Sequence, residues 1–194
     1  MSLAALLLFC LFLFACVGLT RRTAWRLRVQ EGAIAACALL LLALSAFPLA
    51  LSDAVSVSPA SLLLLLIGLY LCRGWPDIAE ALLIAVLSGV LGWCLYSLIP
   101  AYEAGALIAL PAALVPRLLL RRRRTALLCA VAAPLVFGLC RALEDWYLFD
   151  WRMLELGGGV QLDAQVAALF LLALLWYVPS RRRTAVQGQP RTAA

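Results

Sequence analysis

Long apolar runs alternate with short polar segments along the whole chain, and this alternation is its dominant pattern. A transmembrane helix needs about 17–25 mostly apolar residues, and most of the runs reach this length. The pattern therefore predicts an all-α protein, a polytopic transmembrane bundle of about seven helices in a single domain over residues 1–180. The predicted helices cover residues 3–19, 32–51, 54–72, 78–99, 104–120, 125–140 and 164–178.

The third run, residues 54–72, is the weakest, because uninterrupted apolar sequence covers only residues 62–72. Pro59 suits the first turn of a helix, where its missing N–H has no partner to lose. The regular helix can therefore begin near Pro59 and be short. The sequence leaves open whether residues 54–72 form a full spanning helix.

Small residues and prolines predict how the helices pack. Ala81, Ala85 and Gly89 recur every four residues, a spacing that lets a second helix approach closely. Pro111, Pro116 and Pro134 fall inside predicted helices, where each removes a backbone donor and favours a kink.

Residues 141–163 are the longest polar segment between predicted helices. Apolar and aromatic residues recur in it at helical spacing, with charged residues largely opposite. This pattern predicts an amphipathic helix at the outer membrane surface, anchored by Trp146 and Trp151 with its carboxylates displayed outward. An extension of the sixth helix over residues 141–156 fits equally well. Asp163 can cap the last helix, and residues 181–194 are expected to form a disordered cytoplasmic tail.

Composition and charge place the chain in a membrane and orient it. The chain is 66% hydrophobic and 13% charged, and all 16 basic residues are arginines. With the N-terminus outside and the C-terminus inside, 14 of them lie on the inner side, as the positive-inside rule favours. The richness in Ala, Leu and Arg without Lys suggests a bacterial source, and hence a multi-pass protein of the bacterial cytoplasmic membrane. The expected partners are the lipid bilayer, other membrane proteins or a second copy of the chain. Nucleic acid is not expected, because the arginines form short clusters between apolar runs.

The residue inventory limits the possible chemistry. The absence of His excludes imidazole catalysis and His-ligated metals or haem. The seven Cys lie in or at the ends of apolar runs without a Cys-x-x-Cys pair, so they are interpreted as small buried hydrophobes. We expect no cofactor, no metal and no catalytic residue, although an enzymatic activity is not decided by the sequence.

Two groups of ionisable residues are the functional candidates. Arg73, Asp77 and Glu80 lie together at the expected inner surface, where they form either a proton or ion gate or an ordinary ion pair with acidic residues at a helix start. The second group, in the outer segment, could bind a divalent cation or a partner, or do acid–base work. It could equally be what the depletion of arginine leaves behind. Its members are Glu144, Asp145, Asp150, Glu155 and Asp163.

Residues 57–62 (VSPASL), running on to residues 68–70 (GLY), resemble the corresponding stretch of YphA-like membrane proteins of endospore-forming bacteria. The size and the layout of seven apolar runs are similar as well. The resemblance implies a small polytopic bacterial membrane protein. That family has no established activity, so the resemblance implies no functional residue.

These observations define a class of protein and not an activity. The leading hypothesis is a non-enzymatic integral membrane protein that contributes an interaction or scaffold surface in cell-envelope or sporulation biology. A small transporter or channel subunit is the alternative. A membrane enzyme that uses the outer carboxylates is the second alternative.

Overall fold

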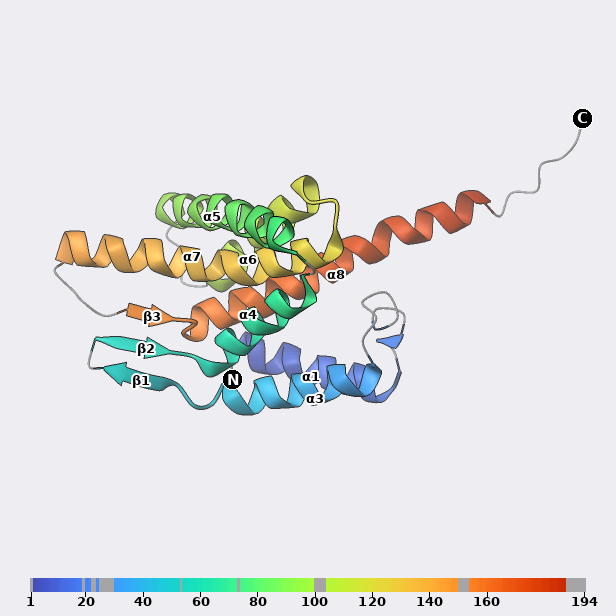
Figure 1. Cartoon of the computed structure of the whole chain (residues 1–194), viewed down its shortest axis with the longest axis horizontal. Coiled ribbons are helices and arrows are strands. Elements are labelled where there is room, and N and C mark those ends of the chain that lie inside the picture. Colours follow the sequence, from blue (N-terminus) through green and yellow to red (C-terminus); the bar gives the residue numbers. More distant parts are fainter. Residues whose placement is uncertain are drawn as a thin grey trace, which may run out of the picture.

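The computed structural model describes residues 2–18, 20, 21, 24, 30–52, 54–72, 74–99, 104–149 and 154–187. Within these residues the protein is mostly helical, with seven helices and one small sheet (Figure 1). The helices are α1 (Leu3–Cys16), α3 (Glu31–Leu44), α4 (Pro59–Leu71), α5 (Trp75–Leu98), α6 (Ala104–Leu119), α7 (Arg123–Phe149) and α8 (Gly159–Gln187). The strands are β1 (Leu49–Ser52), β2 (Val55–Val57) and β3 (Leu154–Leu156).

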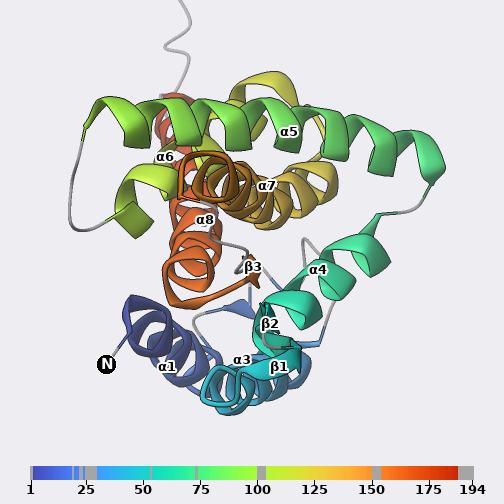
Figure 2. The same cartoon turned by 90° about the vertical axis from the view of Figure 1, so that its left-hand side faces the viewer.

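The helices form layers around α7 and α8. Figure 2 shows α5 above α7, which it crosses obliquely, and α1 and α3 together below α8. In Figure 1, α1, α3, α7 and α8 run along the long direction of the molecule, with the sheet at the end where α3 stops and α8 begins. This arrangement brings chain segments that are far apart in sequence into one bundle.

Three helices are long and apolar enough to cross a membrane: residues Trp75–Leu98, Arg123–Phe149 and Gly159–Trp176. Four apolar helices are shorter, covering Leu3–Cys16, Gly32–Leu44, Pro59–Leu71 and Leu107–Leu119. Because a helix rises about 1.5 Å per residue, each of these four falls short of a hydrocarbon core about 30 Å thick.

The interior of the bundle is built mainly from small side chains. Ala81, Ala85 and Gly89 of α5 are all buried, which confirms the predicted packing face. A Cβ atom added to Gly89 would lie 2.7 Å from the carbonyl oxygen of Ala133 and 2.7 Å from Cβ of Val136, both on α7. Close approach of α5 and α7 therefore depends on the missing side chain at this position.

The sheet was not predicted from the sequence. β1 pairs with β2 as an antiparallel hairpin, and β2 pairs in parallel with β3, about one hundred residues later in the chain. The predicted helix over residues 32–51 ends instead at Leu44, and its last residues form β1. Pro59 does open the next helix, which is short and ends at Leu71, so residues 54–72 begin as a strand.

The last two helices are longer than predicted. α7 continues from the sixth predicted helix to Phe149, so the extension was the correct alternative for residues 141–149 and a separate surface helix was wrong there. α8 begins at Gly159, which places Asp163 inside the helix and excludes it as the cap. α8 also continues to Gln187, so residues 181–187 are helical, in contrast to the predicted disordered tail. Residues 188–194 lie outside the described part.

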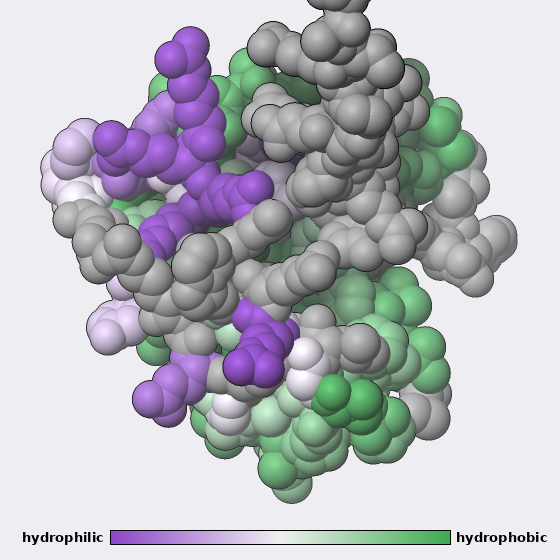
Figure 3. All heavy atoms as spheres, turned by 90° about the vertical axis from the view of Figure 1, so that its right-hand side faces the viewer, coloured by the Kyte–Doolittle hydropathy of each residue, from purple (hydrophilic) through white to green (hydrophobic). Residues whose placement is uncertain are grey.

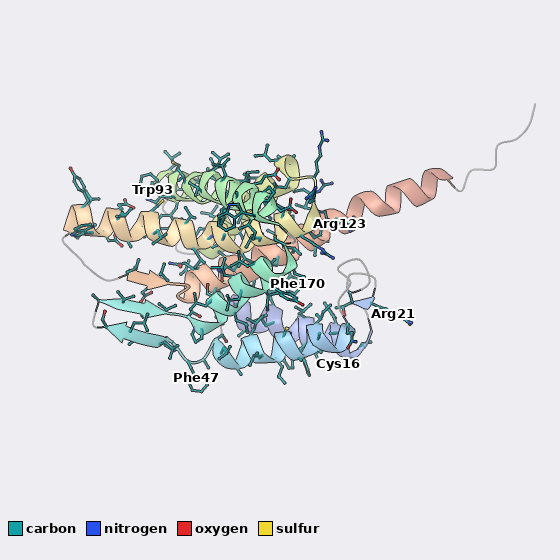
Figure 4. The ribbon with its side chains drawn as sticks, in the orientation of Figure 1. Cys16, Arg21, Phe47, Trp93, Arg123 and Phe170 are labelled. Atoms are coloured by element: carbon teal, nitrogen blue, oxygen red, sulfur yellow. The ribbon has the colours of Figure 1, made fainter. Side chains whose placement is uncertain are left out.

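The exterior of the bundle is apolar along its sides and polar at one end. Large apolar side chains on α1, α3, α4, α5, α6 and α7 are exposed, among them Leu66, Leu83 and Leu118. Figure 4 shows Arg21 and Arg123 at the same end of the molecule as Cys16, far from Phe47 and Trp93. Figure 3 looks at this end and shows hydrophilic residues gathered on it, with hydrophobic residues along the flanks. Soluble proteins rarely expose so much contiguous apolar surface.

Candidate functional site

A cluster of aromatic and charged side chains joins α5 to α7. Its members, here called the α5–α7 cluster, are Trp93, Tyr96, Phe137, Arg141, Glu144 and Asp145. Trp93 Nε1 donates a hydrogen bond to Glu144 Oε2 at 2.9 Å. The Arg141 guanidinium lies 3.6 Å from the Glu144 carboxylate and 3.3 Å from that of Asp145. It also lies 5.2 Å from the centre of the Tyr96 ring, and that ring meets Phe137 edge to face at 5.6 Å.

In this part of α7 the apolar residues are exposed and the charged residues are partly covered, which is the reverse of the pattern on a helix that faces water. Leu143, Trp146 and Tyr147 are exposed, with Tyr147 89% exposed. The charged side chains of Arg141, Glu144 and Asp145 are only partly exposed, and they contact α5 or one another. The prediction that Glu144 and Asp145 display charge outward was therefore wrong.

The chemistry of the α5–α7 cluster is that of a structural link. Glu144 accepts from the indole N–H of Trp93 and lies beside the Arg141 guanidinium, so its carboxylate joins α5 to the charged part of α7. Charge-assisted contacts of this kind are stronger than neutral hydrogen bonds. The two side chains of α5 in this cluster tie the end of that helix to α7.

A second polar junction lies inside the bundle, where α4, α7 and α8 meet. Ser61 Oγ donates to Gln165 Oε1 at 2.8 Å, and Gln165 Nε2 donates to the carbonyl oxygen of Val131 at 2.9 Å. Gln165 is fully buried. Pro134 lies inside α7 and has no N–H for the carbonyl of Ala130, four positions earlier. Gln165 donates to the carbonyl of the next residue, Val131, and so links α8 to this turn of α7.

Next to this junction, the turn from β3 into α8 is fixed by Gln161. Gln161 Oε1 accepts from the N–H of Gly157 at 2.6 Å, and its Nε2 donates to the carbonyl of Glu155 at 2.8 Å. Gly157 has a positive φ of 75°, a left-handed conformation that glycine adopts easily. It also packs directly against Ser61, leaving no space for a Cβ atom.

The outer carboxylates that the sequence grouped together do not form one site. Among the members that the structure describes, only Glu144 and Asp145 share a partner, Arg141. Glu155 lies on β3 with an exposed side chain, and Asp163 accepts from the N–H of Ala4 at 2.6 Å, thereby capping the first turn of α1. Asp150 lies outside the described residues. Among the described residues, no three His, Cys, Asp or Glu side chains are placed to hold a metal ion.

The inner group is arranged around an unexpected partner. Asp77 forms an ion pair with Arg122, which belongs to the turn between α6 and α7. This hydrogen bond to Asp77 raises the pKa of Arg122, and the charge of Glu80 contributes further. Glu80 is exposed, and Arg73 lies outside the described residues. The pair links the first turn of α5 to the start of α7.

The sequence identified the charged residues of the two candidate groups but not the side chains that contact them. Trp93 and Tyr96 lie in an apolar run, where aromatics are ordinary, and nothing local connects them to Glu144. Gln161 and Gln165 did carry a usable signal, because a polar amide in an apolar run must find a partner when lipid surrounds the helix. Comparisons of the chain with protein-family models, with curated proteins and with solved structures gave no match.

Proposed function

We propose that the chain is a non-enzymatic integral membrane protein of a bacterial cytoplasmic membrane, a polytopic bundle of about seven helices. In this proposal the N-terminus lies outside, the C-terminus lies inside, and the protein contributes an interaction surface in cell-envelope or sporulation biology. The three long apolar helices and the exposed apolar side chains support the membrane location. The resemblance to YphA-like proteins supports a bacterial source, and it adds no activity.

The arginines support the orientation. Arg21 and Arg123 lie at one end of the bundle and the sheet lies at the other (Figure 4). α7 has 27 residues and so measures about 40 Å, which exceeds a hydrocarbon core of about 30 Å. With Arg123 at the inner surface, Arg141 and Glu144 would lie near the outer surface, where charged groups reach headgroups and water.

The observation that carries the interaction role is the exposed edge of β1. All four residues of β1 are exposed, with Leu49 at 53% and Leu51 at 71%, and in the described residues the strand pairs only with β2. If the unpaired edge of β1 lay in lipid, each backbone group without a hydrogen bond would cost several kcal/mol. If the edge lay in water, its leucines would be exposed to solvent, which is also unfavourable. An extended segment of another protein satisfies both requirements by adding a strand to the sheet.

The experiment places a photo-crosslinking residue at position 51 in living cells, with position 147 as the matched control. Tyr147 is more exposed than Leu51, at 89% against 71%, and it lies on α7, from which β2 and β3 separate β1. We expect a discrete protein adduct from position 51 and none of that size from position 147. In the same strain, Leu49→Lys plus Leu51→Lys should remove the adduct, because lysine on an edge strand opposes pairing.

The functional readout is complementation of a deletion strain. The double lysine variant should accumulate in the membrane as the wild type does and fail to restore the phenotype. Tyr147→Lys should restore it. Full complementation by the double variant, at wild-type abundance, would show that the β1 edge is not the interaction surface.

A further inference from the structure

A cationic patch beside exposed apolar side chains lies at the end of the bundle that carries Arg21 and Arg123. The Arg patch consists of Arg121, Arg122, Arg123 and Arg124, at the turn from α6 into α7. The first three are exposed, and the Arg122 side chain is 71% exposed even though it pairs with Asp77. Arg123 also lies 5.4 Å from the centre of the Trp176 ring on α8.

The arginines of the patch lie at a helix end that is itself positive. The N-terminus of a helix carries about half a positive charge and favours anions, yet α7 begins at Arg123, within the patch. The exposed side chains of Arg121, Arg122 and Arg123 therefore add positive charge beside a positive helix end, and Asp77 and Glu80 act on Arg122. Both the arginines and the helix end attract an anion.

Exposed apolar side chains next to the patch favour a phospholipid over a small soluble anion as its ligand. Leu118 is 80% exposed and Leu119 is 53% exposed, both directly before the patch in sequence. Trp75, two residues before the Asp77 that pairs with Arg122, is 79% exposed. Trp is favoured at the membrane interface, and leucines beside it suit acyl chains. A small soluble anion would use the arginines alone, whereas a phospholipid uses both features.

We propose that the Arg patch is a binding site for the phosphate headgroup of anionic phospholipids, with their acyl chains against Leu118, Leu119 and Trp75. Guanidinium groups bind phosphate oxygens in a planar, two-point geometry, which makes arginine well suited to this role. The proposal rests on the chain's membrane location. It is independent of which end faces the cytoplasm and of any partner at β1.

The test measures binding of fluorescent phosphatidylglycerol to the purified full-length protein in a neutral detergent. Wild-type protein should bind phosphatidylglycerol more tightly than phosphatidylcholine, and the difference should shrink in 1 M NaCl. Arg121→Gln plus Arg123→Gln should weaken binding roughly fivefold for each charge removed. Arg21→Gln is the matched control, since Arg21 is exposed at the same end of the molecule but lies outside the patch.

Three outcomes would overturn the proposal. Equal affinity for the two lipids in wild-type protein would exclude anionic selectivity, and this measurement does not depend on the variants' folding. An equal loss in Arg21→Gln would show a diffuse charge effect in place of a site. Competition by millimolar inorganic phosphate as effective as by lipid would identify a soluble anion as the ligand.

Discussion

At the scale of single residues, Gly157 shows how tightly the turn into α8 is constrained. Its φ of 75° requires a left-handed backbone, its N–H is held by Gln161, and its α-carbon faces Ser61. The next two glycines have no positive φ, and at Gly158 an added Cβ would lie 2.8 Å from the Glu155 carboxylate. An added Cβ at Gly159 would meet nothing within 4 Å. Only the first glycine of the triplet therefore combines backbone strain with close packing.

Gly157→Ala should destabilise the protein by about 1–3 kcal/mol, because a left-handed non-glycine residue is strained and the new methyl group overlaps Ser61. Gly159→Ala should be neutral or slightly stabilising, since alanine favours the helix that begins there. Thermal unfolding of both variants in detergent micelles checks the difference. Equal unfolding temperatures would mean that the turn relaxes around the methyl group.

At the scale of elements, the pairing of α5 with α7 combines a close approach at Gly89 with the α5–α7 cluster beyond it. The small side chains let the backbones meet, and the contacts of Trp93 with Glu144 and of Tyr96 with Arg141 hold the end of α5 to α7. Both kinds of contact matter in lipid, where the hydrophobic effect does not drive helices together.

Gly89→Leu should reduce the amount of folded protein in the membrane, because its side chain would displace Ala133 and Val136 on α7. The matched control is Gly92→Ala on the same helix. A Cβ at Gly92 would make ordinary contact with Pro111 at 3.5 Å, so this variant should accumulate normally. Membrane fractionation with size-exclusion chromatography measures both. Wild-type accumulation of Gly89→Leu would contradict the observed packing.

Glu144→Ala should lower stability by about 1–3 kcal/mol, because it removes the acceptor of Trp93 and one of two carboxylates beside Arg141. Glu155→Ala should change stability little, since that carboxylate is exposed. Unfolding curves of both variants in the same detergent provide the comparison. If the two variants behave alike, the α5–α7 cluster contributes nothing to stability.

At the scale of the whole molecule, the ends of the bundle differ in chemistry. One end carries the Arg patch and Arg21, and the other carries the sheet. This asymmetry is what a membrane protein with a defined orientation requires, since arginine favours the cytoplasmic side.

Cysteine labelling in a variant without the seven native cysteines tests the orientation. Tyr147→Cys should react with a membrane-impermeant reagent in intact cells. Arg123→Cys should react only after permeabilisation, because the two positions lie near opposite ends of α7. Labelling of position 123 in intact cells, with position 147 protected, would reverse the proposed topology.

The sequence by itself determined that the protein is mostly helical and where, approximately, its helices lie. Hydropathy is a property of a contiguous segment, so runs of apolar residues reveal helices without knowledge of their partners. Pro59 marked a helix start correctly for the same reason, since its effect on the first turn is local. The small-residue face around Gly89 was also visible, because its spacing is written into one helix.

Only the tertiary structure decided which groups meet. Asp77 pairs with a residue 45 positions away, and Asp163 caps α1 across 159 positions. β3 reaches β2 only after α7 has crossed the bundle. The direction of the charges on α7 was equally hidden, because it depends on Trp93 and Tyr96 of α5, which contact Glu144 and Arg141 across the fold. Such choices depend on distances across the fold, which no local pattern contains.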